Sequence, residues 1–153
     1  MGQRGSGEGA MKRKHRIIRA YADVKRRYWC DVRVFDTDAQ MHRDIKRATR
    51  EHPGKDCAGM VSEAKRRGTG LFAIMWLNVE DLAGKPTEIC AHEATHAAIR
   101  YFERRGWTTC MALESQMARH EDAERRHEEK LAYAVGRLTR GVVNGLHRIK
   151  VFG

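Results

Sequence analysis

Long apolar runs, paired cysteines and prolines are all scarce in this chain of 153 residues. The longest uninterrupted apolar stretch, Leu71 to Leu77, is much shorter than the roughly 20 residues that a membrane-spanning helix needs. The four cysteines, Cys30, Cys57, Cys90 and Cys110, are widely separated, form no C-x-x-C motif and follow no secretory signal. We therefore expect reduced thiols and a cytoplasmic protein without a membrane partner.

Acidic residues are also too few to balance the basic ones. Lysine and arginine number 30 against 20 aspartates and glutamates, which gives a formal net charge of +10 at pH 7. A surface of this kind attracts polyanions, so a nucleic-acid partner is possible. However, the basic residues are spread along the chain without a recognised DNA-binding motif, and we interpret them mainly as solvated faces.

The length of the chain indicates one domain. Residues 1–15 form a polar, glycine-containing basic tail that is expected to be disordered, and residues 16–153 are expected to form the domain. Strands are predicted at residues 29–35, 57–64 and 71–79. The third is almost continuously apolar, which indicates burial on both faces or the wall of a cleft. If it borders a cleft, it is expected to bind a substrate peptide by strand addition.

One motif indicates chemistry, the H-E-x-x-H sequence from His92 to His96. It lies in an alanine-rich stretch with no glycine or proline between Thr87 and Arg105, so a helix is predicted there. Residues four apart lie one turn apart on a helix, and both imidazoles can therefore bind one zinc ion. Glu93 is then placed to take a proton from the zinc-bound water. The alternative is a pair of ordinary histidines on a core helix.

A catalytic zinc needs a third protein ligand. The extended metzincin pattern is excluded, because it requires glycine and histidine where this chain has Ile99 and Phe102. A long helix is predicted after about Ser115, with an apolar stripe expected to pack on the zinc helix. The run from Glu128 to Gly136 offers a carboxylate ligand on that helix.

A family resemblance extends from about Asp56 to Val143. Its carriers are the Cys57-Ala58-Gly59-Met60 strand, the Gly70-Leu71-Phe72 strand, the His92-to-Ala97 helix, and an E-x-x-A-Y run containing Glu129, Ala132 and Tyr133. In these the chain resembles the small gluzincin-like proteins of bacteriophages and mobile elements, relatives in outline of minigluzincin peptidases. The resemblance implies two helical histidines and a downstream glutamate as zinc ligands, with the glutamate of H-E-x-x-H as general base.

Two neighbouring glutamates compete for the role of third ligand. Glu129 shares its helical face with Ala132 and Gly136, whose small side chains allow another helix to approach, and this favours Glu129 over Glu128. Tyr133, one turn from Glu129, is a candidate donor to a zinc-bound oxygen or to a ligand carboxylate, or else a core residue.

The histidines of the same region leave a second option open. If His120 or His127 were the third ligand instead, the chain would be closer to the Spartan-type proteases that act near DNA. A solvated charged helix with no ligand is the remaining alternative.

Together these patterns predict an α+β, zincin-like fold in which a small three-stranded sheet packs on the H-E-x-x-H helix and a long C-terminal helix. The expected function is that of a zinc-dependent metallopeptidase-like protein acting on a protein or peptide. It is expected to be phage or mobile-element encoded and to act in the host cytoplasm. The competing hypothesis is a basic effector that binds nucleic acid or a host protein and keeps zinc only for structure.

Overall fold

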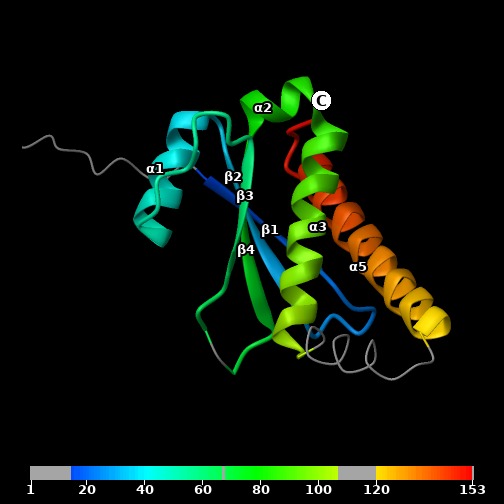
Figure 1. Cartoon of the computed structure of the whole chain (residues 1–153). Coiled ribbons are helices and arrows are strands. Elements are labelled where there is room, and N and C mark those ends of the chain that lie inside the picture. Colours follow the sequence, from blue (N-terminus) through cyan, green and yellow to red (C-terminus); the bar gives the residue numbers. More distant parts are fainter. Residues whose placement is uncertain (1–14, 67, 107–119, 153) are drawn as a thin grey trace, which may run out of the picture.

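A four-stranded sheet lies between one helix on one face and two helices on the other in the computed structural model (Figure 1). The structure describes residues 15–66, 68–106 and 120–152, without the side chains of 120–125. Its elements are β1 (His15–Tyr21), β2 (Trp29–Phe35), α1 (Asp38–Thr49), β3 (Gly59–Glu63), β4 (Leu71–Asn78), α2 (Val79–Gly84), α3 (Pro86–Arg104) and α5 (His120–Arg148). None of the helices in these ranges has the length and apolarity needed to cross a bilayer.

The sheet is mixed, with the strand order β1-β2-β4-β3. β1 pairs with β2 and β3 pairs with β4 in antiparallel fashion, whereas the central strands β2 and β4 run parallel. The prediction of an α+β fold is confirmed. The prediction of three strands is wrong, because β1 buries only Ile18 and Ala20 between exposed and half-buried neighbours. So short an alternation inside a basic segment gave no clear strand signal.

The edges of the sheet are β1 and β3, and this corrects the prediction about strand addition. β4 is hydrogen-bonded on both sides, to β2 and to β3, so its backbone cannot accept a further strand. The continuous apolar run reflects burial on both faces of the sheet. β4 lies between α1 and α3, and Trp76 and Leu77 are at most 1% exposed. β3 is the edge strand that lies beside α3.

The main core fills the space between the sheet and the helices α3 and α5. From α5 it contains Leu138, Val142 and Leu146, all fully buried. α5 continues through Gly141 without a break and packs closely on β1. At Gly145 an added Cβ would lie 2.2 Å from Ile18 Cγ2, so this approach of helix to strand requires glycine.

A second, smaller core joins α1 to the opposite face of the sheet. Thr37 caps the helix and forms a capping box with Gln40. Met41 and Ile45 then pack against Trp76.

Asp44 of α1 is only 4% exposed and faces this same small core. The indole Nε1 of Trp76 and the guanidinium of Arg33 each donate to its carboxylate at 2.9 Å, and Arg47 also donates to it. Burial alone raises the pKa of Asp44, but these donors outweigh that effect and the net pKa is lowered. Asp44 is therefore a fully partnered structural carboxylate.

The expected tail, residues 1–15, lies outside the described residues except for His15, which begins β1.

Candidate metal centre

The H-E-x-x-H motif lies in the first half of α3, a helix that begins with Pro86 at its first turn and ends at Arg104. The helix turns small residues toward the core, where Ala94, Ala97 and Ala98 are fully buried. Because these side chains are short, α3 packs closely on α5 and on the strands β3 and β4. The alanine-rich sequence therefore forms the helix and also brings it close to its neighbours.

His92 and His96 occur on the exposed side of α3 with their rings directed at each other. Their Nε2 atoms are 3.1 Å apart, and the ring planes are nearly perpendicular, at 77°. Two nitrogens held about 2.0–2.1 Å from one tetrahedral zinc are about 3.3 Å apart. The pair thus has nearly the spacing that a shared zinc ion requires, and the donors are of the type that zinc prefers.

Glu93, the next residue after His92, points toward the sheet instead. Its side chain is 5% exposed, and it accepts no hydrogen bond and forms no ion pair within the described part of the chain. Burial raises the pKa of Glu93 to about 7, and the neighbouring His92 offsets part of that increase. The charged form of a carboxylate in such a position is unfavourable, and this is the physical cause of the raised pKa.

Gly59 is the residue of β3 against which Glu93 packs. A Cβ added at Gly59 would lie 2.9 Å from Cγ and Oε1 of Glu93, closer than carbon atoms normally approach. The edge strand therefore passes the Glu93 carboxylate at the one residue type that leaves room for it.

A second contact joins the same two elements at their other end. The Arg104 guanidinium donates to the carbonyl oxygens of Ala64 and Arg66, at 3.0 and 2.7 Å. Gly59 contacts Glu93 near the middle of α3, and Ala64, which follows β3, contacts Arg104 at the end of α3. The strand and this half of the helix therefore run in the same direction.

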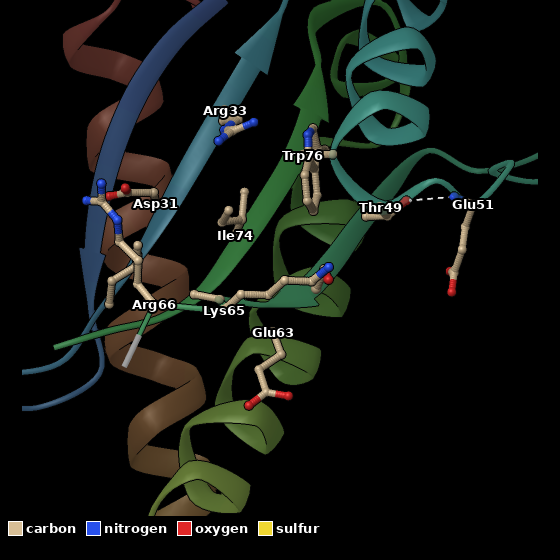
Figure 2. Close-up of a pocket in the computed structure, with 13 residues that line it drawn as sticks. Asp31, Arg33, Thr49, Glu51, Glu63, Lys65, Arg66, Ile74 and Trp76 are labelled. Atoms are coloured by element: carbon tan, nitrogen blue, oxygen red, sulfur yellow. Dashed lines mark hydrogen bonds between the residues drawn. The ribbon is translucent and has the colours of Figure 1, made fainter. Parts of the chain in front are cut away.

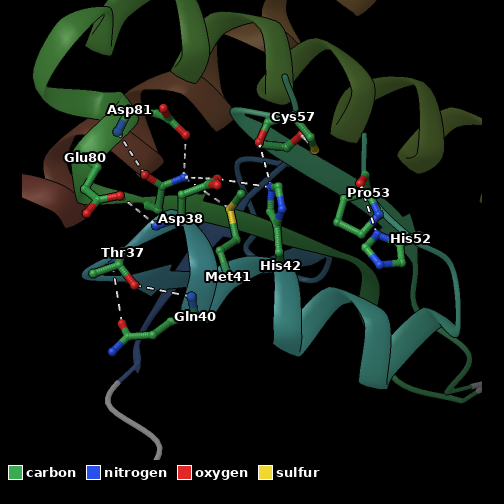
Figure 3. Close-up of polar contacts among 12 residues, drawn as sticks. Thr37, Asp38, Gln40, Met41, His42, His52, Pro53, Cys57, Glu80 and Asp81 are labelled. Atoms are coloured by element: carbon green, nitrogen blue, oxygen red, sulfur yellow. Dashed lines mark hydrogen bonds and ion pairs between the residues drawn. The ribbon is translucent and has the colours of Figure 1, made fainter. Parts of the chain in front are cut away.

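A polar network holds the start of β3 in place (Figure 3). His42 Nε2 lies 3.0 Å from Asp38 Oδ1 and 3.2 Å from the carbonyl oxygen of Cys57. Both partners are acceptors, so His42 carries its proton on Nε2. Asn78, fully buried at the end of β4, caps α2 by accepting from the Asp81 backbone and donates to the Asp81 carboxylate. The network therefore fixes the segments that lead into β3 and α3.

The cysteines of this region have raised pKa values, which disfavour the thiolate form that binds a metal. Cys90 is fully buried within the core, and burial raises the pKa of its thiol to about 11. Burial also raises the pKa of Cys57, and the nearby carboxylates of Glu93 and Asp38 add to the effect. The Cys57 thiol donates to the Gly59 carbonyl. Cys110 lies outside the described residues.

The predicted third ligand is separate from the histidine pair. Glu128, Glu129 and Tyr133 lie on the amino-terminal part of α5, and all three are exposed, Tyr133 by 65%. Tyr133 is therefore not a core residue. Figure 1 shows this end of α5, in yellow, diverging from α3. Within the described ranges no group of three His, Cys, Asp or Glu side chains is placed to hold a metal ion, and the side chain of His120 is not among those described.

Sequence reasoning missed Gly59 as part of the site, although a signal was present. A glycine inside a strand often marks a place where another group approaches the backbone closely. The sequence pattern predicted only a strand at Gly59. Comparisons of the chain with protein-family models, with curated proteins and with solved structures gave no match. The site is therefore interpreted from its own geometry.

Proposed function

We propose that this chain is a zinc-dependent, gluzincin-like metallopeptidase. The observation that carries the proposal is the pair of converging imidazoles, 3.1 Å apart at Nε2, beside a buried Glu93 that has no partner in the described chain. An ordinary pair of helix histidines gives no reason for an unpartnered carboxylate next to them. A bound cation does, because its charge would compensate the buried carboxylate.

The described residues supply two of the three protein ligands that a hydrolytic zinc site needs. His92 and His96 are the two ligands that the helix supplies. Zinc bound there would polarise a scissile carbonyl and lower the pKa of water toward about 7. Glu93 accepts the proton of the attacking water at its carboxylate and passes it to the leaving amide nitrogen. Its burial supports this role, since a carboxyl group with a pKa of about 7 can both take up and release a proton near neutral pH.

An extended peptide is the substrate that the neighbouring strand favours. β3 is an edge strand, so one side of its backbone is unpaired within the sheet and can bind a substrate segment by strand addition. Gly59 places that strand directly against Glu93. We therefore assign the binding of a substrate peptide by strand addition to β3 and not to residues 71–79.

The third ligand stays a prediction. Glu129 is favoured by the E-x-x-A-Y resemblance and by the small residues on its helical face, while its exposed side chain lies on α5 and does not join the histidine pair. The expected setting, the cytoplasm of a phage host, rests on the resemblance alone.

The proposal is tested by metal content and peptide hydrolysis on the same preparations. Elemental mass spectrometry of protein purified without added metal is expected to give about one zinc per chain, lost in His92→Ala. Glu129→Ala is expected to lose zinc and Glu128→Ala, its matched control, to keep it. No zinc in the wild type, and none bound on titration, would overturn the proposal.

Glu93→Gln separates the enzyme from a structural zinc protein. For an enzyme, this variant keeps its zinc and loses hydrolysis of an unstructured, fluorogenically labelled protein substrate. A variant that keeps both would show that Glu93 is not the base.

A further inference from the structure

One face of α1 carries only basic side chains beyond its first turn. Arg43, Lys46 and Arg47 lie on this face, Arg50 follows as the C-cap residue in the left-handed conformation, and all four are exposed. We call these four residues the α1 basic stripe. Met41, Asp44 and Ile45 occupy the opposite, buried side of the helix. The stripe therefore faces directly away from the sheet.

The charges of the stripe are largely unneutralised. Arg47 pairs with the buried Asp44, which Arg33 also contacts, so that one carboxylate serves two guanidinium groups. Arg43, Lys46 and Arg50 form no ion pair or hydrogen bond through their side chains within the described chain. Favourable interaction with the helix dipole accounts for cations in the last turn, but Arg43 lies earlier, in the middle of the helix.

The length of the stripe matches the spacing of phosphates in nucleic acid. From Arg43 to the last helical residue, Thr49, the helix rises about 9 Å, at about 1.5 Å per residue, and Arg50 follows directly. One strand of a duplex carries a phosphate about every 3.4 Å along the axis, so roughly three phosphates lie beside this length.

A pocket of about 600 Å³ lies between the end of α1 and the β3–β4 connection (Figure 2). Thr49 borders it on the α1 side, and Lys65 and Arg66 border it on the other, where Figure 2 shows Lys65 running across the pocket. Three carboxylates also line the pocket, those of Asp31, Glu51 and Glu63. Oδ1 of Asp31 lies 3.7 Å from Nε of Arg19. The pocket itself is therefore mixed in charge, and Lys65 and Arg66 add two cations on the side away from α1.

We propose that the α1 basic stripe, together with Lys65 and Arg66, binds the phosphate backbone of nucleic acid. The α1 basic stripe lies across the sheet from α3, whereas Arg66 is joined to the end of α3 through its backbone carbonyl, 2.7 Å from the Arg104 guanidinium (Figure 1). It also locates part of the +10 net charge, which the sequence left spread along the chain. The chemistry is shared by duplex DNA, single-stranded DNA and RNA, and it predicts contacts to phosphates without base specificity.

The test compares two variants with the same net charge. The stripe variant is Arg43→Gln/Lys46→Gln/Arg50→Gln. The control is Arg140→Gln/Arg148→Gln/Lys150→Gln, which removes three exposed cations on or just after α5, across the sheet from α1. Thermal melting confirms that both variants are folded. Fluorescence anisotropy of labelled 20-mers, as duplex DNA, single-stranded DNA and RNA, gives Kd across a salt series.

The wild type and the control are expected to bind at least one of these probes alike. The stripe variant is expected to bind it at least tenfold more weakly at about 0.1 M salt, with a log–log salt slope shallower by about 2.7 for duplex DNA, or about 0.9 per lost phosphate contact. Equal weakening in both variants would show that net charge alone acts and would overturn the proposal. So would a wild type that binds none of the probes at low salt, or that binds only vesicles containing phosphatidylserine.

Discussion

Asp44 and Glu93 are buried to almost the same degree, at 4% and 5% exposure, yet their surroundings are opposite. Each lies on a helix that faces the sheet, Asp44 on α1 and Glu93 on α3. Three donors surround Asp44 and lower its pKa, whereas Glu93 has no partner in the described chain and its pKa is raised to about 7. Burial alone therefore does not set the direction of a carboxylate's pKa shift in this fold, because the donors around Asp44 reverse the effect that burial has on Glu93.

The largest expected effect on stability comes from removing Asp44. Asp44→Ala leaves the Trp76 indole and the buried side of Arg33 without their acceptor, so we expect the free energy of unfolding to fall by about 3–5 kcal/mol. Urea denaturation measures this change. The control is Asp36→Ala, which removes an exposed pair with Arg16 and should cost at most about 1 kcal/mol. Equal losses in the two variants would contradict the structural role of Asp44.

Adding a methyl group at Gly59 tests the tight packing around Glu93. Gly59→Ala places a Cβ 2.9 Å from the Glu93 side chain, and we expect a loss of about 1–3 kcal/mol from overpacking. In a Glu93→Ala background that contact is absent, and alanine in a strand should then be neutral or stabilising by about 0.5–1 kcal/mol. A double-mutant cycle by urea denaturation measures the coupling. Additive effects would contradict the contact.

Acid should remove the contribution of Asp44 selectively. Its pKa in the folded protein is below the ordinary value of 3.8, so the stabilisation is complete above that value and is lost as pH falls through the folded pKa. Urea denaturation from pH 6 to pH 3 is expected to show the wild type approaching Asp44→Asn in stability at the acid end. A difference between the two that stays constant or widens as the pH falls would contradict the lowered pKa.

The smallest expected effect on stability comes from removing the carboxyl group of Glu93. Glu93→Gln, measured in the presence of a metal chelator, should leave the free energy of unfolding within about 0.5 kcal/mol of wild type, because Glu93 accepts no hydrogen bond in the described chain that the substitution could remove. The matched substitution Asp44→Asn should be clearly destabilising at neutral pH. If Glu93→Gln destabilised the protein as much, Glu93 would be a second structural carboxylate.

The elements that could be predicted were those with strong local patterns. α1 has its capping box, α3 has an unbroken alanine-rich sequence, and β4 has a continuous apolar run. β1 was missed because two buried residues give too short an alternation. The sheet order could not be read locally either, since the position of β3 at the edge depends on pairings distant in sequence.

The candidate site was predictable to the same extent. The helical period alone brings His92 and His96 together, and the structure shows them converging. The burial of Glu93 depends on where β3 passes α3, which no local pattern contains. Glu129 and Tyr133 were placed from periodicity on a helix whose angle to α3 the sequence does not specify, and both are exposed.

The two contacts between β3 and α3 also constrain the length of the chain. Five strand steps from Gly59 to Ala64, at about 3.3 Å each, and eleven helix steps from Glu93 to Arg104, at about 1.5 Å each, both span about 16.5 Å. Inserting or deleting one residue in the strand would shift it by about 3.3 Å and turn its side chains to the opposite face. We therefore expect homologues to vary in residue type along β3 but to preserve the number of residues between the two contacts.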